Sequence, residues 1–300
     1  MTITLQSLRE RASGLNRRVA VACAHDEDVL KAVIMAADAH ICTPTLFGNE
    51  RRIRSILGSL GADHKAFHIV ESGDGGADAS AEAAIQAVID CEADFLMKGA
   101  MSTSDLLKHV VRSPLVQGIP LSHTMIFEVP AYGKLLVNTD GGMNPAPDLA
   151  RKKAILENAA VLLKTLGYET ITTACVSGSE VVSEKIPSTT DAKALAEMDW
   201  SRYNMEVYGP VGLDLAISEQ ARVHKGYNVP GVKDADILLM PNYETANCFG
   251  KALTYFAGAR SAGLVVGARC PIVLVSRADP AETKLSSLAL GAIAAKGETT

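Results

Sequence analysis

Aromatic residues are scarce in this sequence. Phe, Trp and Tyr make up 5% of the 300 positions, although 48% of the residues are hydrophobic. Small and branched aliphatic side chains therefore fill most of the core, which is typical of parallel strands covered by helices and excludes a disordered chain. A chain of this length forms one large α/β domain or two lobes, and we expect two lobes.

The sequence also lacks a basic stripe and a long apolar run. It has 29 Lys and Arg against 34 Asp and Glu, with the two signs mixed along the chain, so we expect no nucleic-acid partner. No window is apolar for long enough to span a bilayer, and we expect no membrane partner. The first eighteen residues have no apolar core, so we expect no signal peptide and a cytoplasmic protein.

Metal-binding and nucleotide-binding spacings are missing as well. No C-x-x-C pair or H-E-x-x-H motif occurs, so we expect no metal site. The six cysteines lie mostly in apolar runs and have no histidine partner in the sequence, which favours reduced core residues over a catalytic thiol. The P-loop spacing is absent, and the glycine-rich stretch 72–76 lacks the dinucleotide fingerprint and is interpreted as a loop.

Short runs rich in β-branched residues alternate with longer amphipathic segments, a pattern that predicts strand-helix-strand units around mostly parallel sheets. Residues 124–129 and 134–138 flank a short turn and are expected to pair as an antiparallel hairpin near a lobe boundary. Helices are expected at 149–166, with Pro147 at or near the first helical position, near Asp191, Leu213 and Asn242, and at 280–294. The other expected strands are 18–24, 43–47, 66–70, 94–97, 171–176, 235–240, 263–266 and 272–275.

The strongest local signal is PIVLVSRADPAETKL, residues 271–285. A buried strand ends at Ser276-Arg277 and a helix follows at once, with Asp279 expected as N-cap and Glu282 in the capping-box position. A hydroxyl, a guanidinium and free backbone N–H groups at one strand end suit an anionic group such as phosphate. An ordinary capped helix with a solvated Arg277 fits these residues equally well.

A second strand-to-helix junction is DFLMKGAMSTSDLLKHV, residues 94–110. Ser102 is expected as N-cap, with Asp105 as its capping-box partner, and Thr103 begins the helix. Lys98 and Lys108 add positive charge. The residues by themselves favour a plain capped helix, because such junctions recur in α/β proteins.

Polar side chains also gather at three other strand ends, where open α/β sheets bind ligands. A lone histidine in such a segment is more often structural than a proton carrier, and asparagines there are often turn or cap residues. The candidates are His123 in 121–123, Asp140 and Asn144 in 139–144, and Asn247 in 241–247.

Taken together, these segments resemble the phosphate acetyl/butyryltransferase family along nearly the whole chain, and their wording is closer to the butyryltransferases. The matching blocks occur in the family's order: KGAMSTSDLL, LSHTMIFEVP, TDGGMNPAPDL, GPVGLDLAIS, KDADILLMPNYETANCFGKALTYFAGA and PIVLVSRAD.

The resemblance implies a fold and an activity. It implies two α/β lobes similar to isocitrate and isopropylmalate dehydrogenases, with the active site in the cleft between them, in homodimers or larger assemblies. It assigns the C-terminal segment to the first lobe, so the expected lobes are 1–142 plus 268–300, and 143–267. The implied substrates are acyl-CoA and inorganic phosphate, with coenzyme A as a substrate and no permanently bound cofactor.

The resemblance also assigns residues. Ser276 and Arg277 fall on a pair implicated in binding phosphate and the transferred acyl group, and with Asn144 and Asn247 they are the expected catalytic residues. Lys108 stands where acetyltransferases have an arginine associated with coenzyme A, so the charge is kept without the bidentate fork. The expected substrate-binding residues are Lys98, Ser102, Thr103, Lys108, His123, Asp140, Glu244 and Lys251.

This sequence departs from the acetyltransferases at the catalytic aspartate, where Thr283 stands, and the resemblance leaves the general base open. A non-catalytic acyl-CoA binder is therefore one alternative. A related enzyme that forms acyl phosphate from acyl carrier protein is another. A metal-dependent 2-hydroxy-acid dehydrogenase needs clustered aspartates that the sequence does not show.

Overall fold

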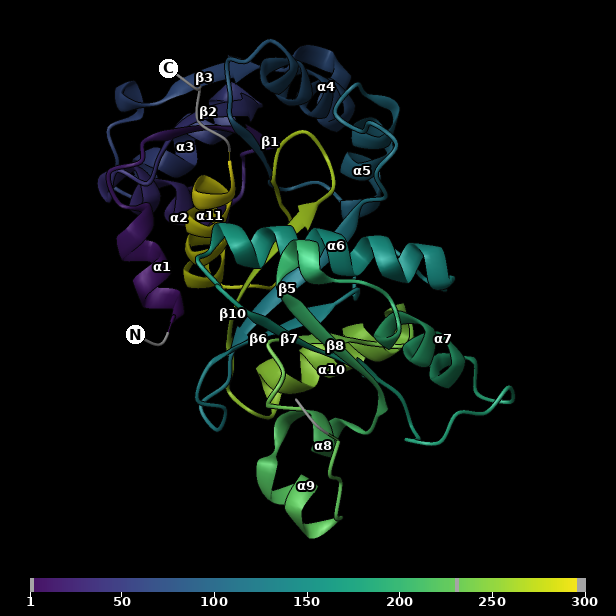
Figure 1. Cartoon of the computed structure of the whole chain (residues 1–300). Helices are drawn as coiled ribbons and strands as arrows, with labels where there is room; N and C mark the ends of the chain where they lie inside the picture. Colours follow the sequence, from purple (N-terminus) through teal and green to yellow (C-terminus); the bar gives the residue numbers. More distant parts are fainter. Residues whose placement is uncertain (1–2, 230–231, 296–300) are drawn as a thin grey trace. The chain divides into compact units, whose positions relative to one another are not determined.

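Strands and helices alternate along most of the chain, as the sequence pattern predicted (Figure 1). The computed structural model describes residues 3–229 and 232–295, and these form two units. Unit 1 comprises residues 3–4, 120–229 and 232–261, and unit 2 comprises residues 5–119 and 262–295. The expected first lobe ended at residue 142, whereas the hairpin after residue 120 belongs to unit 1. Residues 1–2 and 296–300 of that expected lobe lie outside the described residues.

Unit 2 contains strands in the order β3-β2-β1-β4-β11-β10, paired in parallel except that β10 is antiparallel to β11. Its strands are β1 Arg17–Ala22, β2 Cys42–Gly48, β3 His68–Glu71, β4 Phe95–Lys98, β10 Arg260–Val266, which begins in unit 1, and β11 Ile272–Val273. Its helices are α1 Leu5–Ala12, α2 Glu27–Asp38, α3 Glu50–Ser59, η1 His64–Ala66, η2 Gly73–Gly75, α4 Gly76–Ile89, α5 Thr103–Arg112 and α11 Ala281–Ala294.

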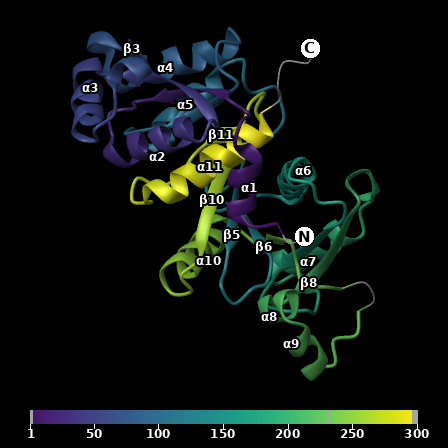
Figure 2. The ribbon, with the colours of Figure 1, turned by 90° about the vertical axis from the view of Figure 1, so that its left-hand side faces the viewer.

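Helices cover both faces of the unit 2 sheet. The crossovers from β1 to β2 and from β2 to β3 move outward, whereas the crossover from β3 to β4 returns past β1, so right-handed connections place α4 on the face opposite α2 and α3. The contacts agree, since α11 packs against α1 and α2 while α4 packs against α5 (Figure 2). This double cover explains why β4 is buried along its whole length.

Unit 1 contains strands in the order β5-β6-β9-β7-β8. The predicted antiparallel hairpin is confirmed as β5–β6, and the other neighbours are parallel. Its strands are β5 Ser122–Glu128, β6 Leu135–Thr139, β7 Ile171–Val176, β8 Met205–Val211 and β9 Ile237–Leu239. Its helices are α6 Leu149–Thr165, α7 Pro187–Ala196, η3 Ser201–Tyr203, α8 Leu213–Ile217, α9 Glu219–His224 and α10 Tyr243–Tyr255.

The structure differs from three local expectations. Strand β8 was missed because Gly209-Pro210 reads as a turn, whereas β8 is the last strand in the sheet order, where a proline is tolerated. Residues 64–66 form the short helix η1, so β3 begins later than predicted, and β11 has two residues where four were predicted. Pro147 lies near the first helical residue, as predicted, and immediately precedes the N-cap Asp148.

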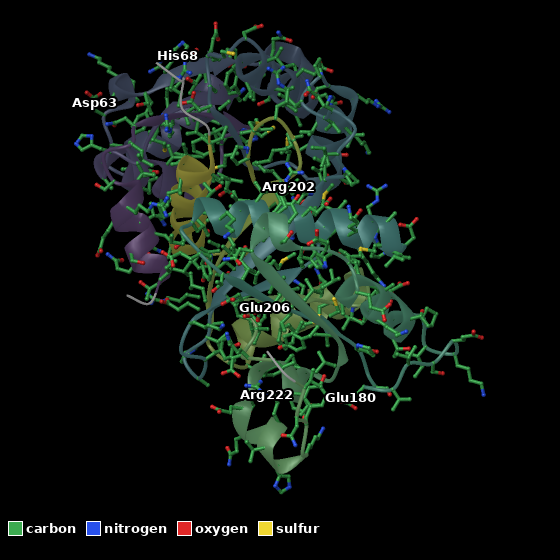
Figure 3. The ribbon with its side chains drawn as sticks, viewed as in Figure 1. Asp63, His68, Glu180, Arg202, Glu206 and Arg222 are labelled. Atoms are coloured by element: carbon green, nitrogen blue, oxygen red, sulfur yellow. The ribbon has the colours of Figure 1, made fainter. Side chains whose placement is uncertain are left out.

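Charged side chains of both signs extend from the ribbon, among them Asp63, Glu180, Arg202 and Glu206 (Figure 3). Within the described ranges, no helix has both the length and the apolar character needed to cross a bilayer.

Gly99 marks the closest approach of two strand ends in unit 2. Its N–H donates to Ala22 O at 2.8 Å, and the next N–H, of Ala100, donates to Cys23 O at 2.8 Å. A Cβ at position 99 would lie 2.2 Å from Cys23 O and 2.6 Å from Ala22 O, both backbone atoms. Only glycine therefore allows the ends of β1 and β4 to meet in this way.

We predict that Gly99→Ala lowers the free energy of unfolding by about 1–3 kcal/mol, because the methyl group forces two backbone segments apart. Gly58→Ala is the matched control, since nothing lies within 4 Å of its Cβ position on α3, and it leaves stability unchanged or raises it by up to about 1 kcal/mol. Denaturant unfolding measures both, and equal stability of the two variants would contradict the close approach.

Candidate active site

The polar groups at the end of β11 form a tight turn in unit 2. Ser276 N–H donates to Asp279 Oδ2 at 2.8 Å, and Asp279 N–H donates back to Ser276 O at 3.1 Å. The Ser276 hydroxyl also accepts from Ala278 N–H at 3.3 Å. Ser276 and Arg277 are exposed on this turn. The sequence therefore placed a hydroxyl and a guanidinium correctly beside a strand end.

The predicted capping box of α11 is wrong. Pro280 occupies the N-cap position and no side chain caps the helix. Asp279 is not the cap because its carboxylate accepts from Ser276 N–H instead. Glu282 does not reach back to the helix start but forms an ion pair with Arg9 at 2.6 Å. The acidic side chains of this segment thus stabilise the turn and a contact with α1.

Lys98, at the end of β4, is buried with 3% of its surface exposed. Its Nζ donates to Gly99 O and Met101 O, each at 3.2 Å. Burial, followed by the positive charges of Arg277 and Lys284, lowers the pKa of Lys98 to about 8. The sequence identified Lys98 as a candidate but gave no sign of its burial.

The start of α5 agrees with its predicted cap. Ser102 is the N-cap, and its Oγ accepts from Asp105 N–H at 3.1 Å. Asp105 Oδ2 accepts from the Ser102 hydroxyl at 2.5 Å rather than from its backbone N–H, so the capping box is modified. Thr103 is half-buried in the first turn, whereas Lys108 is exposed and pairs with Asp105 at 2.9 Å. The hydrogen bond from Ser102 and the charge of Lys108 lower the pKa of Asp105.

In unit 1, the loop after β6 is organised around Asp140, which is 3% exposed. Its Oδ1 accepts from Gly142 N–H and Met143 N–H, both at 2.8 Å. Its Oδ2 accepts from His123 N–H at 3.1 Å and from Asn144 Nδ2 at 2.5 Å. Four donors thus occupy this carboxylate, which holds the loop in one conformation.

The other unit 1 candidates border this loop. The His123 ring lies against Gly142, where a Cβ would come within 2.4 Å of His123 Nδ1. Asn144 Nδ2 also donates to Leu121 O at 2.9 Å, and Asn247 Nδ2 donates to Gly141 O at 3.0 Å. The structure therefore gathers His123, Asp140, Asn144 and Asn247 around one loop, with both asparagine amides used to hold it.

Glu244 and Lys251 lie on α10, whose N-cap is Asn242. Both side chains are exposed, and Asn242 Oδ1 accepts from Thr245 N–H at 2.9 Å. The expected helix start near Asn242 is confirmed.

Lys284 was not among the predicted site residues. It is 2% exposed within the first turns of α11 and donates to Asp279 O. It lies among apolar positions of the closing helix, and this position in the sequence could have indicated that Lys284 is buried. His25 was missed too. It follows β1, and burial, together with Arg52, lowers its pKa.

Among the described residues, no cluster of three His, Cys, Asp or Glu side chains could hold a metal ion.

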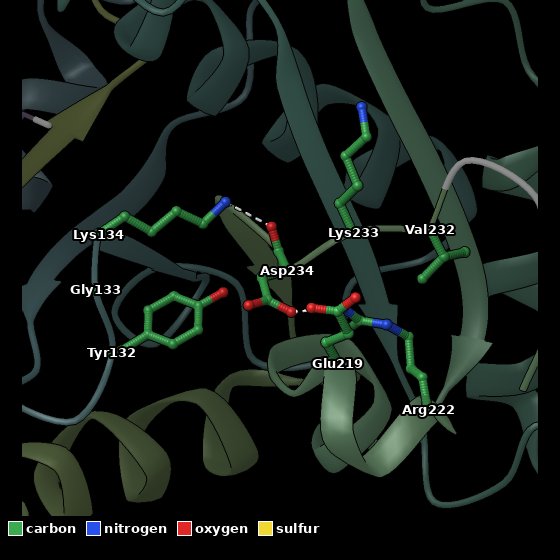
Figure 4. A pocket seen from close by; sticks show the side chains of 8 residues that line it. All are labelled: Tyr132, Gly133, Lys134, Glu219, Arg222, Val232, Lys233 and Asp234. Atoms are coloured by element: carbon green, nitrogen blue, oxygen red, sulfur yellow. Dashed lines mark hydrogen bonds and ion pairs between the residues drawn. The ribbon is translucent and has the colours of Figure 1, made fainter. Parts of the chain in front are cut away.

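A cavity of about 570 Å³ lies elsewhere in unit 1 (Figure 4). Lys134 and Asp234, which line it, precede β6 and β9, so the cavity is at the amino-terminal ends of these parallel strands. Two of its lining cations have acid partners, since Arg222 pairs with Asp234 at 2.7 Å and Lys134 pairs with Asp236 at 2.7 Å. Ligands of open α/β sheets bind at the opposite, carboxyl ends, so this cavity is not the candidate site.

We predict that Asp140→Asn lowers the free energy of unfolding by about 1–3 kcal/mol, because its amide NH₂ meets a donor where the carboxylate accepted one. Asp38→Asn, at an exposed position at the end of α2, serves as the control and changes stability by less than about 0.5 kcal/mol. Thermal or denaturant unfolding compares the two. If the Asp140→Asn variant were as stable as the wild type, the carboxylate would not organise the loop.

Comparison with known proteins gives consistent results. The family model for phosphate acetyl/butaryl transferase matches residues 3–82 and 76–292. The chain is 37% identical to a phosphate acetyltransferase of Thermotoga maritima, over 96% of this chain and 99% of that protein. It is 38% identical to a phosphate butyryltransferase of Clostridium acetobutylicum, over 93% of each. The crystal structure of a branched-chain phosphotransacylase from Enterococcus faecalis superimposes with a TM-score of 0.82 at 32% identity, covering 93% of this chain and all of that one.

Proposed function

This chain belongs to the phosphate acetyl/butaryl transferase family, and we propose on that basis that it transfers a short acyl group between coenzyme A and inorganic phosphate. The match of the family model from residue 3 to residue 292 carries the proposal. The exposed Ser276-Arg277 turn and the buried Lys98 support it, because they place a hydroxyl and positive charge at strand ends of unit 2.

The reaction needs positioning and charge stabilisation more than covalent catalysis. A phosphate oxygen attacks the thioester carbonyl, the carbonyl oxygen becomes an oxyanion, and the carbon–sulfur bond then breaks to release coenzyme A as a thiolate that takes up a proton. Arg277 suits the anionic phosphate and the developing oxyanion, because its guanidinium has no ion-pair partner among the described residues. Ser276 donates a neutral hydrogen bond beside it.

The remaining candidate residues bind substrate or shape the site. Ser102, Thr103 and Lys108 contact coenzyme A at the start of α5, and Lys98 adds positive charge near them. His123, Asp140, Asn144 and Asn247 shape the loop that borders the reacting groups, since their backbone and amide hydrogen bonds hold it rigid. Glu244 and Lys251 bind substrate from α10.

We propose five further features of this protein. They are the likeness to isocitrate and isopropylmalate dehydrogenases, an active site in a cleft between lobes, homodimeric or larger assemblies, a cytoplasmic location, and coenzyme A as a substrate with no permanently bound cofactor.

One observation favours a second candidate, a non-catalytic acyl-CoA binder. Thr283 occupies the position of the acetyltransferase aspartate, and its hydroxyl cannot accept a thiol proton as a carboxylate does. Neighbouring Glu282 is paired with Arg9 at 2.6 Å. The acyltransferase and the non-catalytic binder would both bind coenzyme A, but only the acyltransferase would turn over substrate.

We predict phosphate-dependent release of coenzyme A from a short acyl-CoA by the purified protein. A thiol reagent measures the release across acetyl-, propionyl- and butyryl-CoA, and the reaction without phosphate is the control for hydrolysis. Binding of acyl-CoA with no phosphate-dependent thiol release would select the non-catalytic binder.

We predict that Arg277→Ala lowers kcat roughly 100-fold or more, by comparison with the removal of one oxyanion donor. Arg277→Lys recovers only part of the activity, since a point charge does not reproduce the planar fork, and Ser276→Ala has a milder effect because it removes one neutral hydrogen bond. Arg51→Ala, at an exposed position on α3, is the matched control. Near-normal turnover of folded Arg277→Ala would show that the turn is only the connection into α11.

A further inference from the structure

Two lysines of unit 2 are buried almost completely. Lys98 lies at the end of β4 with 3% of its surface exposed, and Lys284 lies in α11 with 2% exposed. Their ammonium groups donate to backbone carbonyl oxygens: Lys98 to Gly99 O and Met101 O, and Lys284 to Asp279 O. Carbonyl groups supply dipoles but no negative charge.

In unit 1, by contrast, a buried lysine and a half-buried lysine each have a carboxylate partner. Lys152, 5% exposed, forms an ion pair with Asp191 at 2.7 Å, and Lys134 forms one with Asp236 at 2.7 Å. Among the residues that the structure describes, no carboxylate lies within ion-pair distance of Lys98 or Lys284. Burying an ammonium group without a counter-charge costs free energy. Lys98 and Lys284 therefore lack an anion, and the protein itself does not supply one.

The two lysines share one region with the Ser276 turn. Val273 pairs in register with Met97, so the chain that leaves β11 runs beside Lys98. The charges of Arg277 and Lys284 both disfavour protonation of Lys98, and those of Asp26 and Asp279 oppose them with smaller effect. The local charge is therefore positive on balance, at the strand ends where α/β sheets bind ligands.

Lys284 also fixes the turn itself. It donates to Asp279 O, while the Asp279 carboxylate accepts from Ser276 N–H at 2.8 Å. The position of the Ser276 hydroxyl and of the neighbouring Arg277 thus depends on a lysine that contacts neither side chain directly.

We propose that Lys98 and Lys284 form a buried cationic pair that binds the inorganic phosphate of the reaction beside Ser276 and Arg277. The inference rests on the proposed function and adds its phosphate subsite. Coenzyme A also carries phosphate groups, but these are attached to a bulky nucleotide. Ammonium groups this deeply buried suit a compact free ion, whereas the exposed Lys108 suits coenzyme A.

Sulfate is the probe for a direct test, because it resembles phosphate and keeps its charge between about pH 6.5 and 9.5, where phosphate and Lys98 titrate. Isothermal titration calorimetry measures its affinity for the wild-type protein as a function of pH. The protonated lysine binds the anion, so affinity is highest at low pH and falls as pH rises through the pKa of Lys98, about 8 in the free protein. This measurement needs no substitution.

Lys98→Met and Lys284→Met each weaken sulfate binding by roughly tenfold or more, as expected for the loss of a charge-assisted hydrogen bond. Lys98→Met also flattens the pH dependence. In kinetics, both variants raise the KM for phosphate more than the KM for acyl-CoA. Lys31→Met is the matched control, because Lys31 is a partly exposed lysine of unit 2 that pairs with Glu27, and it changes neither quantity.

Four results would overturn the inference: wild-type sulfate affinity that does not change with pH, lysine variants that bind sulfate like the wild type, an unchanged KM for phosphate in both variants, or a rise in the KM for acyl-CoA alone, which assigns the lysines to coenzyme A. Failure of the proposed function is a separate outcome. Lysine-dependent sulfate binding without acyl transfer refutes the acyltransferase activity and leaves the anion site standing, whereas acyl transfer with an unchanged KM for phosphate in both variants refutes the anion site alone.

Discussion

Backbone N–H groups that emerge from the ends of parallel strands have to find acceptors once the strand ladder stops, and short polar side chains supply them throughout this protein. Asp140 accepts from three backbone N–H groups and one amide. Asp279 accepts from Ser276 N–H, Ser80 Oγ accepts from Cys23 N–H at 2.8 Å, and Ser102 caps α5. Each loop at these strand ends therefore has a fixed shape before any ligand is present.

The need to satisfy these backbone N–H groups divides the polar residues into two sets. Some side chains hold a loop in place, and others remain available to contact a substrate. The carboxylates of Asp140 and Asp279 and the amides of Asn144 and Asn247 are engaged by backbone groups. They are suited to preorganisation, which keeps reorganisation small when charge develops on a substrate. The charges of exposed Arg277 and of buried Lys98 and Lys284, by contrast, have no acid partner among the described residues.

The two units provide different partners for their buried lysines. Unit 1 pairs its buried Lys152 and half-buried Lys134 with aspartates, whereas unit 2 surrounds Lys98 and Lys284 with carbonyl oxygens. A net charge of −5 for the whole chain conceals this local positive excess. An enzyme that handles phosphate and coenzyme A benefits from such an excess, because it lowers the free energy of bound anions.

The sequence by itself determined the alternation of strands and helices, the β5–β6 hairpin, the N-cap Ser102 and the position of Ser276-Arg277 at a strand end, because these features depend on local patterns a few residues long. The family blocks also identified the acyltransferase chemistry to be tested. Only the tertiary structure decided that Asp279 binds Ser276 N–H instead of capping α11, that Glu282 pairs with Arg9, and that Lys98 and Lys284 are both buried. Burial and pairing depend on segments that are distant in the sequence and come into contact only when α11 packs against the sheet. A local sequence pattern does not specify which distant side chain will be its contact.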